Sequence, residues 1–297
     1  MKSARRAILA DSSLFIVACI WGSTFIVVKD AIDYIPVYSF LFMRFGLAGL
    51  LLVGINLVRR KAIPLRSLVD GFFLGTALFL VFAFQTYGLR TTPASVTAFI
   101  TGLYVIFVPL LWSLIRRALP SWNVALGILL ALAGLALVTL REAISLTSGE
   151  FLVLICAIFC AVHIILTDTF SKRNDAAILT MVQVSIVSLE SLAFSLYYDP
   201  GVIPDAFPSP VILALIVTSI FATVVAFGVQ TAVQKFTSPN HTAIIFTMEP
   251  VAAAIFSALM GESPLNLRQY LGGGLIIAAM ILTKSGGTNL DDPEIHA

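Results

Sequence analysis

The sequence predicts an all-α integral membrane protein in which ten transmembrane helices form two inverted five-helix repeats. Of its 297 residues, 59% are hydrophobic and 11% are charged, whereas soluble domains carry about a quarter charged residues. Its apolar runs last about 20 residues, the length of a helix that crosses a bilayer, and not the roughly 10 alternating residues of a barrel strand. The two halves of the chain also match each other at a constant offset.

Ten apolar runs are long enough to cross a hydrocarbon core of ~30 Å. The connections between them are short and polar, so no domain outside the membrane is expected between spans. All three cysteines lie inside apolar runs, which argues against a disulfide framework. The expected spans are Ser12 to Lys29, Pro36 to Val58, Leu68 to Leu89, Pro93 to Ile115, Ser121 to Leu140, Glu150 to Phe170, Ala177 to Tyr198, Pro210 to Gln234, Asn240 to Met260 and Asn266 to Thr283.

The distribution of basic residues predicts that both termini are cytoplasmic, because Lys and Arg are retained on that side of the membrane. With this orientation only Lys29, Arg90, Arg141 and Arg268 lie outside, and Arg44 lies within a span. We interpret the first span as an uncleaved helix and not a signal peptide. The expected inside residues are Lys2, Arg5, Arg6, Arg59, Arg60, Lys61, Arg66, Arg116, Arg117, Lys172, Arg173, Lys235 and Lys284.

An internal repeat becomes visible when the chain is shifted on itself by about 145 residues, as from Gln85 to Gln230. Because each half holds five spans, the second half enters the membrane from the opposite side, the arrangement of many alternating-access transporters. We therefore divide the chain into repeats at 1–141 and 142–297. The matched residues are Gln85 and Thr86 with Gln230 and Thr231, Arg90 with Lys235, and Thr97 and Ala98 with Thr242 and Ala243.

Several short motifs in the chain resemble those of the EamA family of the drug/metabolite transporter superfamily. They are Trp21-Gly22-Ser23, the stretch from Pro36 to Arg44, the helix starts at Thr92 and Ser238, and the run Glu249-Pro250-Val251 followed by Gly261 and Glu262. In the second half Cys160 and Ala161 replace the Trp21-Gly22 pair. The resemblance implies a bacterial inner-membrane secondary carrier that exports amino acids, other metabolites or toxic compounds.

Glu249 is the first candidate for substrate binding, because an ionisable residue near the bilayer centre is costly and usually functional. Pro250 follows it and is expected to kink the helix and free the carbonyl of Phe246. The alternative is a structural tether beside the kink. Thr242, Phe246 and Glu249 share one helical face, which the repeat maps onto Thr97, Thr101 and Tyr104, so the two faces are expected to line one cavity.

Arg44 is the second charged candidate within a span. Its depth matches that of Glu190, so the two side chains can form an ion pair that offsets the cost of burial. A ligand for a substrate carboxylate is the alternative role.

His163 lies near the middle of the sixth span and is a candidate hydrogen-bonding group, proton acceptor or buried core histidine. Cys156 and Cys160 share its face, but no second cluster completes a tetrahedral site, so no metal is expected.

Other polar or aromatic residues inside spans are candidates for the cavity wall. Trp21 is unusual in mid-span, since tryptophan prefers the membrane interface, and Thr24 lies beside it. Gln85 and Gln230 are expected near opposite faces, as gates that hydrogen-bond across the halves or as packing polarity. The substrate-binding residues predicted from sequence are Trp21, Thr24, Arg44, Gln85, Thr101, Tyr104, His163, Gln230, Phe246 and Glu249.

The sequence therefore predicts a secondary transporter for small metabolites, with amino acids favoured and proton-coupled efflux of cationic drugs as the alternative. It contains no ATPase motif, metalloprotease motif or nucleophile elbow, so neither ATP-driven transport nor catalysis is expected. An intramembrane enzyme or a scaffold is a remote alternative. Expected partners are the lipid bilayer, a small solute and protons as a candidate coupling ion. We expect no cofactor or nucleic acid, and a monomer or homodimer.

Overall fold

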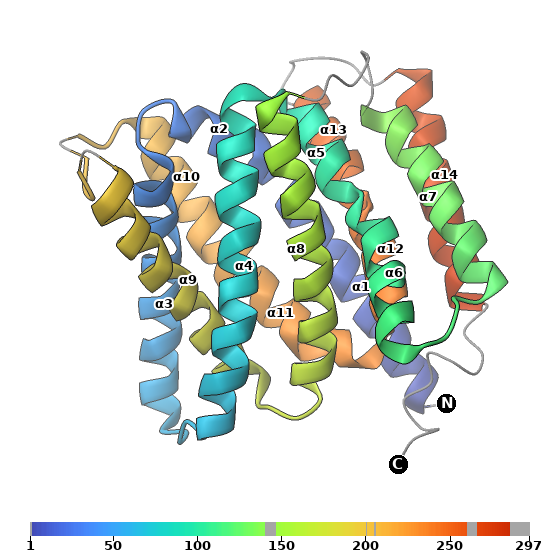
Figure 1. Ribbon diagram of the computed structural model, residues 1–297, viewed down its shortest axis with the longest axis horizontal. Helices are drawn as coiled ribbons and strands as arrows, with labels where there is room; N and C mark the ends of the chain where they lie inside the picture. The colour runs from blue at the N-terminus through green and yellow to red at the C-terminus, as the bar shows by residue number, and fades with distance from the viewer. Residues whose placement is uncertain (1, 140–146, 200, 205, 260–265, 286–297) are drawn as a thin grey trace.

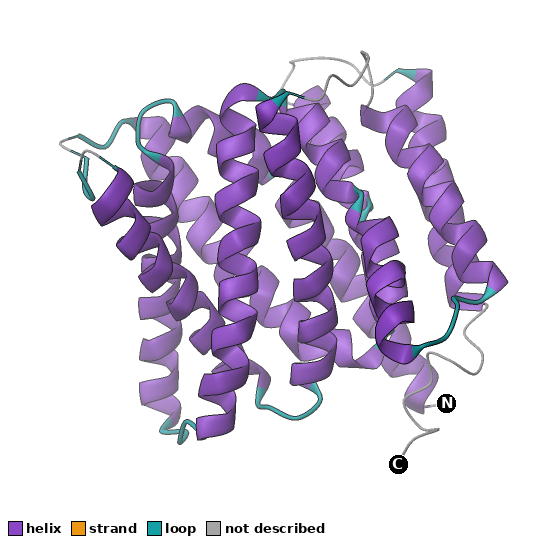
Figure 2. Cartoon of the chain, viewed as in Figure 1, coloured by secondary structure: helices purple, strands orange, loops and turns teal. Residues whose placement is uncertain are grey.

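The computed structural model describes residues 2–139, 147–199, 201–204, 206–259 and 266–285. Throughout these ranges the regular structure is helical, with no strand (Figure 2). The predicted repeat boundary at 141/142, Arg141 and the Gly261-Glu262 motif lie outside the described residues.

The helices follow the predicted spans closely. Seven segments are long and apolar enough to cross a membrane, and shorter apolar helices cover 122–138 and 267–283. The chain is thus a multi-pass helical membrane protein, while the count of ten spans and the inverted repeat remain predictions. The elements are α1 Lys2–Gly22, α2 Thr24–Ile32, α3 Val37–Arg59, α4 Leu65–Thr91, α5 Ala94–Gly102, α6 Tyr104–Arg116, α7 Trp122–Thr139, α8 Ser148–Ser171, α9 Ala176–Tyr198, α10 Ser209–Ser219, η1 Ile220–Val225, α11 Ala226–Val233, η2 Gln234–Phe236, α12 Pro239–Phe246, α13 Met248–Leu259 and α14 Leu267–Ser285.

Three predicted spans are interrupted near their middle. Between α1 and α2 the hydroxyls of Ser23 and Thr24 donate to the carbonyls of Ile20 and Trp21, each at 2.7 Å, and such bonds compete with the helical ladder. Another break, at Leu103, separates α5 from α6.

The third break separates α12 from α13 at Thr247, three residues before the predicted kink at Pro250. Proline lacks the amide that the carbonyl of Phe246 would bond in a continuous helix. The Thr247 hydroxyl donates to the carbonyl of Ile244 at 2.6 Å, so the chain turns before the proline is reached.

The eighth predicted span contains a different irregularity. Residues Ile220–Val225 form a π-helix, η1, in which the amide of Ala226 bonds the carbonyl of Phe221, five residues back. A π-turn is wider than an α-turn and is frequent at functional sites.

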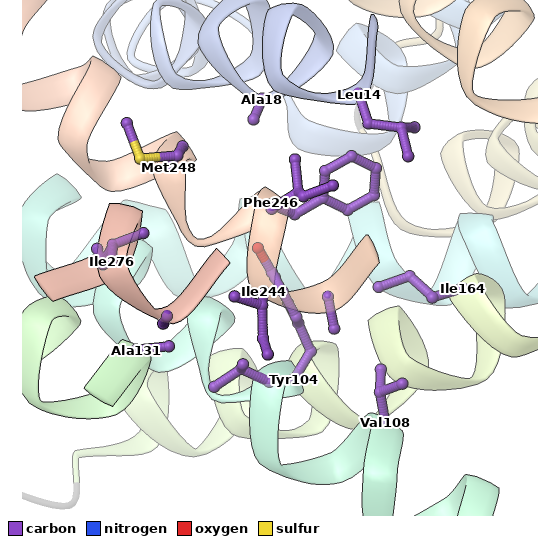
Figure 3. Close-up of a cluster of buried hydrophobic side chains, with 14 of the residues drawn as sticks. Leu14, Ala18, Tyr104, Val108, Ala131, Ile164, Ile244, Phe246, Met248 and Ile276 are labelled. Atoms are coloured by element: carbon purple, nitrogen blue, oxygen red, sulfur yellow. The ribbon is translucent and has the colours of Figure 1, made fainter. Parts of the chain in front are cut away.

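The helices form a bundle in which α3, α4, α8 and α9 pack side by side and α7 pairs with α14 at the opposite edge (Figure 1). The interrupted helices occupy the space between these groups. A buried apolar cluster around Leu14, Tyr104, Ile244 and Phe246 joins α1, α6, α7, α8, α12 and α14 (Figure 3). The breaks therefore lie in the interior of the bundle.

Two of the breaks meet directly. A side-chain carbon added to Gly22, at the end of α1, would lie 2.2 Å from the backbone carbonyl oxygen of Glu249 in α13. Only glycine permits this approach, which brings Trp21 and Glu249 to one place.

Candidate substrate cavity

One cavity lies among the interrupted helices, and water centres can occupy about 90 Å³ of it. A single buried water needs about 10–15 Å³ on this measure, so the cavity has room for a small solute or several waters. All ten residues predicted to bind substrate lie on its wall. Their role in binding remains a prediction. The other lining residues are Phe25, Val28, Leu78, Val81, Phe82, Thr86, Leu89, Cys160, Ile164 and Phe227.

The acidic group of the cavity is Glu249, in the first turn of α13. Among the described residues its carboxylate has no hydrogen-bond or ion-pair partner within the protein. The Tyr104 side chain lines the same cavity. It is only 3% exposed, and its hydroxyl has no hydrogen-bond partner among the described residues. An unpaired carboxylate and an unpaired phenol thus face the same space.

The basic group of the cavity is Arg44 of α3, which is 3% exposed. Its Nε donates to Thr223 Oγ1 at 3.1 Å, and its guanidinium lies 4.5 Å from the ring centre of Phe82 and 5.0 Å from that of Phe45.

The ion pair that equal depth allowed between Arg44 and Glu190 does not form in the described structure. Glu190 accepts a hydrogen bond from Thr76 at 2.6 Å instead, outside the cavity. Depth along a helix does not give the direction in which a side chain points, so the predicted pair was wrong.

Trp21 contributes aromatic surface to the wall that also carries Glu249 and Arg44. Its ring lies 5.1 Å from that of Phe246, three residues before Glu249, and 5.1 Å from that of Phe227, four residues after Thr223. Its indole N–H donates to the carbonyl of Ala222 in η1 at 2.9 Å. The orientation of this ring is thereby fixed by the π-helix.

His163 of α8 lies on the wall and is held from behind. Its Nε2 lies 3.0 Å from Gln183 Oε1, and Gln183 Nε2 donates to Thr231 Oγ1 at 3.2 Å. Since the amide oxygen only accepts, this assignment makes Nε2 the protonated nitrogen and leaves Nδ1 as an acceptor. Sequence reasoning missed Gln183, although a glutamine within an apolar run was a visible signal. The structure buries this side chain fully.

The two glutamines do not bond across the halves as gates. Gln85 donates to Thr101 of the same half at 3.3 Å. Gln230 donates to Gln234 at 2.9 Å, and Gln234 bonds the carbonyl of Ile164 at 2.7 Å. Both side chains line the cavity, but the expected cross-half hydrogen bond was wrong.

The thiol face of α8 also reaches the cavity. Cys160 lines it and Cys156 is buried behind it, with the two sulfur atoms 3.8 Å apart. Within the described ranges, no three His, Cys, Asp or Glu side chains come close enough together to hold a metal.

A group of charged residues outside the cavity is paired. Asp70 of α4 accepts from Arg173 Nε at 2.8 Å and from Asn174 Nδ2 at 2.6 Å. Lys61 pairs with Asp175, the N-cap of α9, and its ammonium holds the pKa of Asp175 below its usual value, helped by the amide of Ile178. We call these five residues the α4–α9 polar cluster.

Comparison with known proteins identifies relatives along nearly the whole chain. The model of the EamA-like transporter family matches residues 8–140 and again 147–285. The chain is 31% identical over 280 residues to an uncharacterized transporter of Archaeoglobus fulgidus, covering 94% of this chain and 87% of that protein. It is 24% identical over 284 residues to the uncharacterized inner membrane transporter YedA of Escherichia coli, covering 92% and 90%. A solved crystal structure matches the fold with a TM-score of 0.75 over 92% of this chain and 95% of that chain, at 15% identity.

Proposed function

The chain belongs to the EamA-like transporter family, and from this premise we propose that it exports small zwitterionic metabolites, foremost amino acids, across a bacterial inner membrane. The names of the family and of these relatives are those of transporters and not enzymes. The proposal adds the substrate class, the direction of transport and the residues that bind.

The observation that carries the proposal is the presence of one acidic and one basic side chain, neither with an ion-pair partner among the described residues, on the wall of a single cavity. Glu249 and Arg44 have no ion-pair partner among the described residues, and both line the same space. An unpaired buried charge is costly. A solute with an ammonium group and a carboxylate offsets this cost at both ends, whereas a purely anionic or cationic solute offsets it at one.

The rest of the wall fits a solute with an apolar side chain. Trp21, Phe246 and Phe227 provide aromatic surface beside the charged groups. Hydroxyl and amide groups, such as the hydrogen-bonded pair of Thr101 and Gln85, are outnumbered on the wall by apolar side chains. A cavity that is mostly apolar with a few convergent polar groups is typical of small-molecule sites.

The interrupted helices support alternating access as the mechanism. Broken spans around a central site are common in secondary transporters built from inverted repeats. On α4 the cavity wall runs from Leu78 to Leu89, about 16 Å of helix rise, toward the end that basic-residue counting places outside. We propose that the two halves rock around this cavity and expose it to either side in turn.

Counterflow in proteoliposomes tests the proposal. Proteoliposomes that contain the purified protein are loaded with an unlabelled amino-acid mixture. The uptake of single labelled amino acids into these vesicles is then measured. We expect exchange of at least one zwitterion, and Glu249→Gln should reduce it at least tenfold. Glu190→Gln is the matched control, since it removes a membrane carboxyl that does not line the cavity. Exchange confined to cations or anions, or equal loss in both variants, contradicts the proposal.

A second candidate is proton-coupled efflux of cationic compounds. It is favoured by the aromatic rings of Trp21 and Phe246 near the unpaired carboxylate of Glu249, because aromatic faces attract organic cations. A carrier of this kind uses Glu249 to exchange a proton for the cation. Glu249→Gln would then retain exchange of substrate for substrate and lose uphill transport driven by a pH gradient. Loss of exchange itself favours the zwitterion proposal.

A further inference from the structure

The cavity-lining arginine of the first half is held by the π-helix of the second half at two points. The hydroxyl of Ser219, directly before η1, donates to the backbone carbonyl of Arg44 at 2.9 Å. Thr223, inside η1, accepts from Arg44 Nε at 3.1 Å. Both the backbone and the side chain of this arginine are therefore hydrogen-bonded to one short segment of the eighth span.

The remaining donors of Arg44 are its two terminal amino groups. Within the described chain, neither of these amino groups donates a hydrogen bond to an oxygen atom. The residue also lines the cavity. Phe45 and Phe82 contact the guanidinium as rings, which accept no conventional hydrogen bond. With Nε occupied by Thr223, the fork formed by the two terminal groups is the part left to bind a ligand.

The geometry of this fork selects the ligand. A planar guanidinium binds a carboxylate through two parallel hydrogen bonds, a match that an ammonium cannot reproduce. Recognition of a phosphate dianion usually draws on several convergent cations, and Arg44 is the only Lys or Arg on the described wall, which it shares with Glu249. A singly charged carboxylate is the ligand that this site fits.

The segment that holds Arg44 also orients Trp21. A π-turn is wider than an α-turn and is frequent at functional sites, and the carbonyl of Ala222 in η1 accepts the indole N–H of Trp21 at 2.9 Å. The next residue, Thr223, holds Arg44. Two adjacent residues of the π-helix thus orient the aromatic and the cationic groups of the cavity.

We infer that Arg44 is the carboxylate-binding group of the cavity and that Thr223 is the residue that positions it, an inference that deepens the proposed function and rests on it. Substitution of Thr223 should change the discrimination between a carboxylate and its uncharged analogue without removing the cavity. The sequence alone gave Arg44 no such partner.

Binding is measured by tryptophan fluorescence in a variant that carries Trp112→Phe and Trp122→Phe, so that Trp21 on the cavity wall is the sole reporter. The probes are leucine, leucinamide, which lacks the carboxylate, and 4-methylpentanoate, which lacks the ammonium. Arg44→Gln should lower the binding affinity for leucine and for 4-methylpentanoate by about ten- to a hundredfold, which is the effect of losing hydrogen bonds to a charged group. Leucinamide should change by less than about twofold.

Thr223→Val keeps the shape of the side chain and removes its hydroxyl. It should lower the ratio of leucine to leucinamide affinity by about three- to tenfold, on the order of one neutral hydrogen bond, and Thr223→Ser should restore the ratio. Thr218→Val is the matched control, because the Thr218 hydroxyl bonds the carbonyl of Ala214 in its own helix at 2.6 Å and does not line the cavity. Arg44→Lys should bind both acids more weakly than wild type.

Equal loss of leucine and leucinamide in Arg44→Gln or Thr223→Val overturns the inference and assigns both residues a structural role. The inference is also overturned if neither leucine nor 4-methylpentanoate binds the single-tryptophan protein while leucinamide does. If Arg44→Gln does not fold, Arg44→Lys and Thr223→Val decide the matter. A ratio that responds as expected in a protein that exchanges no solute in liposomes would sustain this subsite and contradict the transport proposal alone.

Discussion

The charges in the cavity and the charges of the α4–α9 polar cluster satisfy opposite requirements. In the cluster, the Asp70 carboxylate receives hydrogen bonds from Arg173 and Asn174, and its charge is compensated within the protein. In the cavity, Arg44 and Glu249 each lack a charged protein partner among the described residues. The cluster thus holds helices together, whereas the two cavity groups are the ones for which we propose a solute as the partner.

The two regions also differ in the continuity of their helices. The cluster joins α4, α8 and α9 at their ends, and these helices are continuous. The cavity is lined in part by α3, α4 and α8, which are continuous, but the rest of its wall comes from spans broken at Ser23, Leu103 and Thr247 and from α11, which follows the π-helix η1. Continuous helices with paired ends form a rigid support, whereas interrupted helices can change their angle with little loss of hydrogen bonding.

The largest expected effect concerns the acid of the cavity. Glu249→Gln should reduce transport at least tenfold, consistent with the loss of about 1.5–3 kcal/mol from a hydrogen bond to a charged group. Its melting temperature in detergent should stay close to that of wild type, because no protein partner is lost. A melting temperature that falls as far as in Asp70→Ala would erase the distinction between the two regions.

The next effect, on stability, concerns the cluster. Asp70→Ala should lower the free energy of unfolding by about 2–3 kcal/mol, below the usual cost of breaking a buried pair because Arg173 is partly solvated. Thermal unfolding in detergent measures this loss. Solute binding by the folded fraction should be unchanged, and weakened binding in this variant would show that the cluster and the cavity are coupled.

A smaller effect is expected where two breaks touch. In Gly22→Ala the new methyl group would meet the Glu249 carbonyl oxygen and the side chain of Ala252, so α1 and α13 must separate, at a cost of about 1–3 kcal/mol. Solute affinity should fall together with the melting temperature. Gly54→Ala is the control, since open space surrounds that position. If Gly22→Ala and Gly54→Ala behave alike, the close contact between α1 and α13 does not contribute to stability or to solute affinity.

The smallest effect concerns the exposed pair of the cluster. The pKa of Asp175 is lowered by Lys61, so this pair stabilises the protein above the unfolded-state pKa of about 3.9. That contribution is lost as the pH falls through the lower folded-state pKa. Both side chains are more than a third exposed, so Lys61→Ala should cost below about 1 kcal/mol at pH 7. Melting curves of the two proteins should converge as the pH falls below the unfolded-state pKa of about 3.9, and a constant gap would exclude the ion pair as its cause.

The sequence was most informative about the spans and the cavity wall. The hydrophobic runs placed the helices, and the repeat together with mid-span polarity picked out ten residues that lie on one wall. Whether they bind a solute remains to be measured. Features that depend on direction around a helix were not predictable, and for this reason Arg44 was paired by depth with Glu190 and not with Thr223.

The π-helix could not be predicted either. The segment Ile220–Val225 contains no glycine or proline, and its β-branched and apolar residues are those of an ordinary span. Its side-chain contacts come from Trp21 and Arg44, about 180 to 200 residues earlier in the chain, and such distant contacts cannot be inferred from the segment itself. The break at Thr247 was anticipated more closely, because Pro250 removes a specific amide.

Two arginines carry a consequence for biogenesis. Arg60 and Arg117 follow α3 and α6 in the left-handed conformation, with φ of 52° and 53°, a position where helices usually end in glycine. A side chain there costs about 1 kcal/mol. The cation complements the helix C-terminus, and it lies in loops whose positive charge directs insertion. Glycine at both positions would relax the folded protein while weakening the signal that orients the nascent chain, so a more stable variant would insert less faithfully.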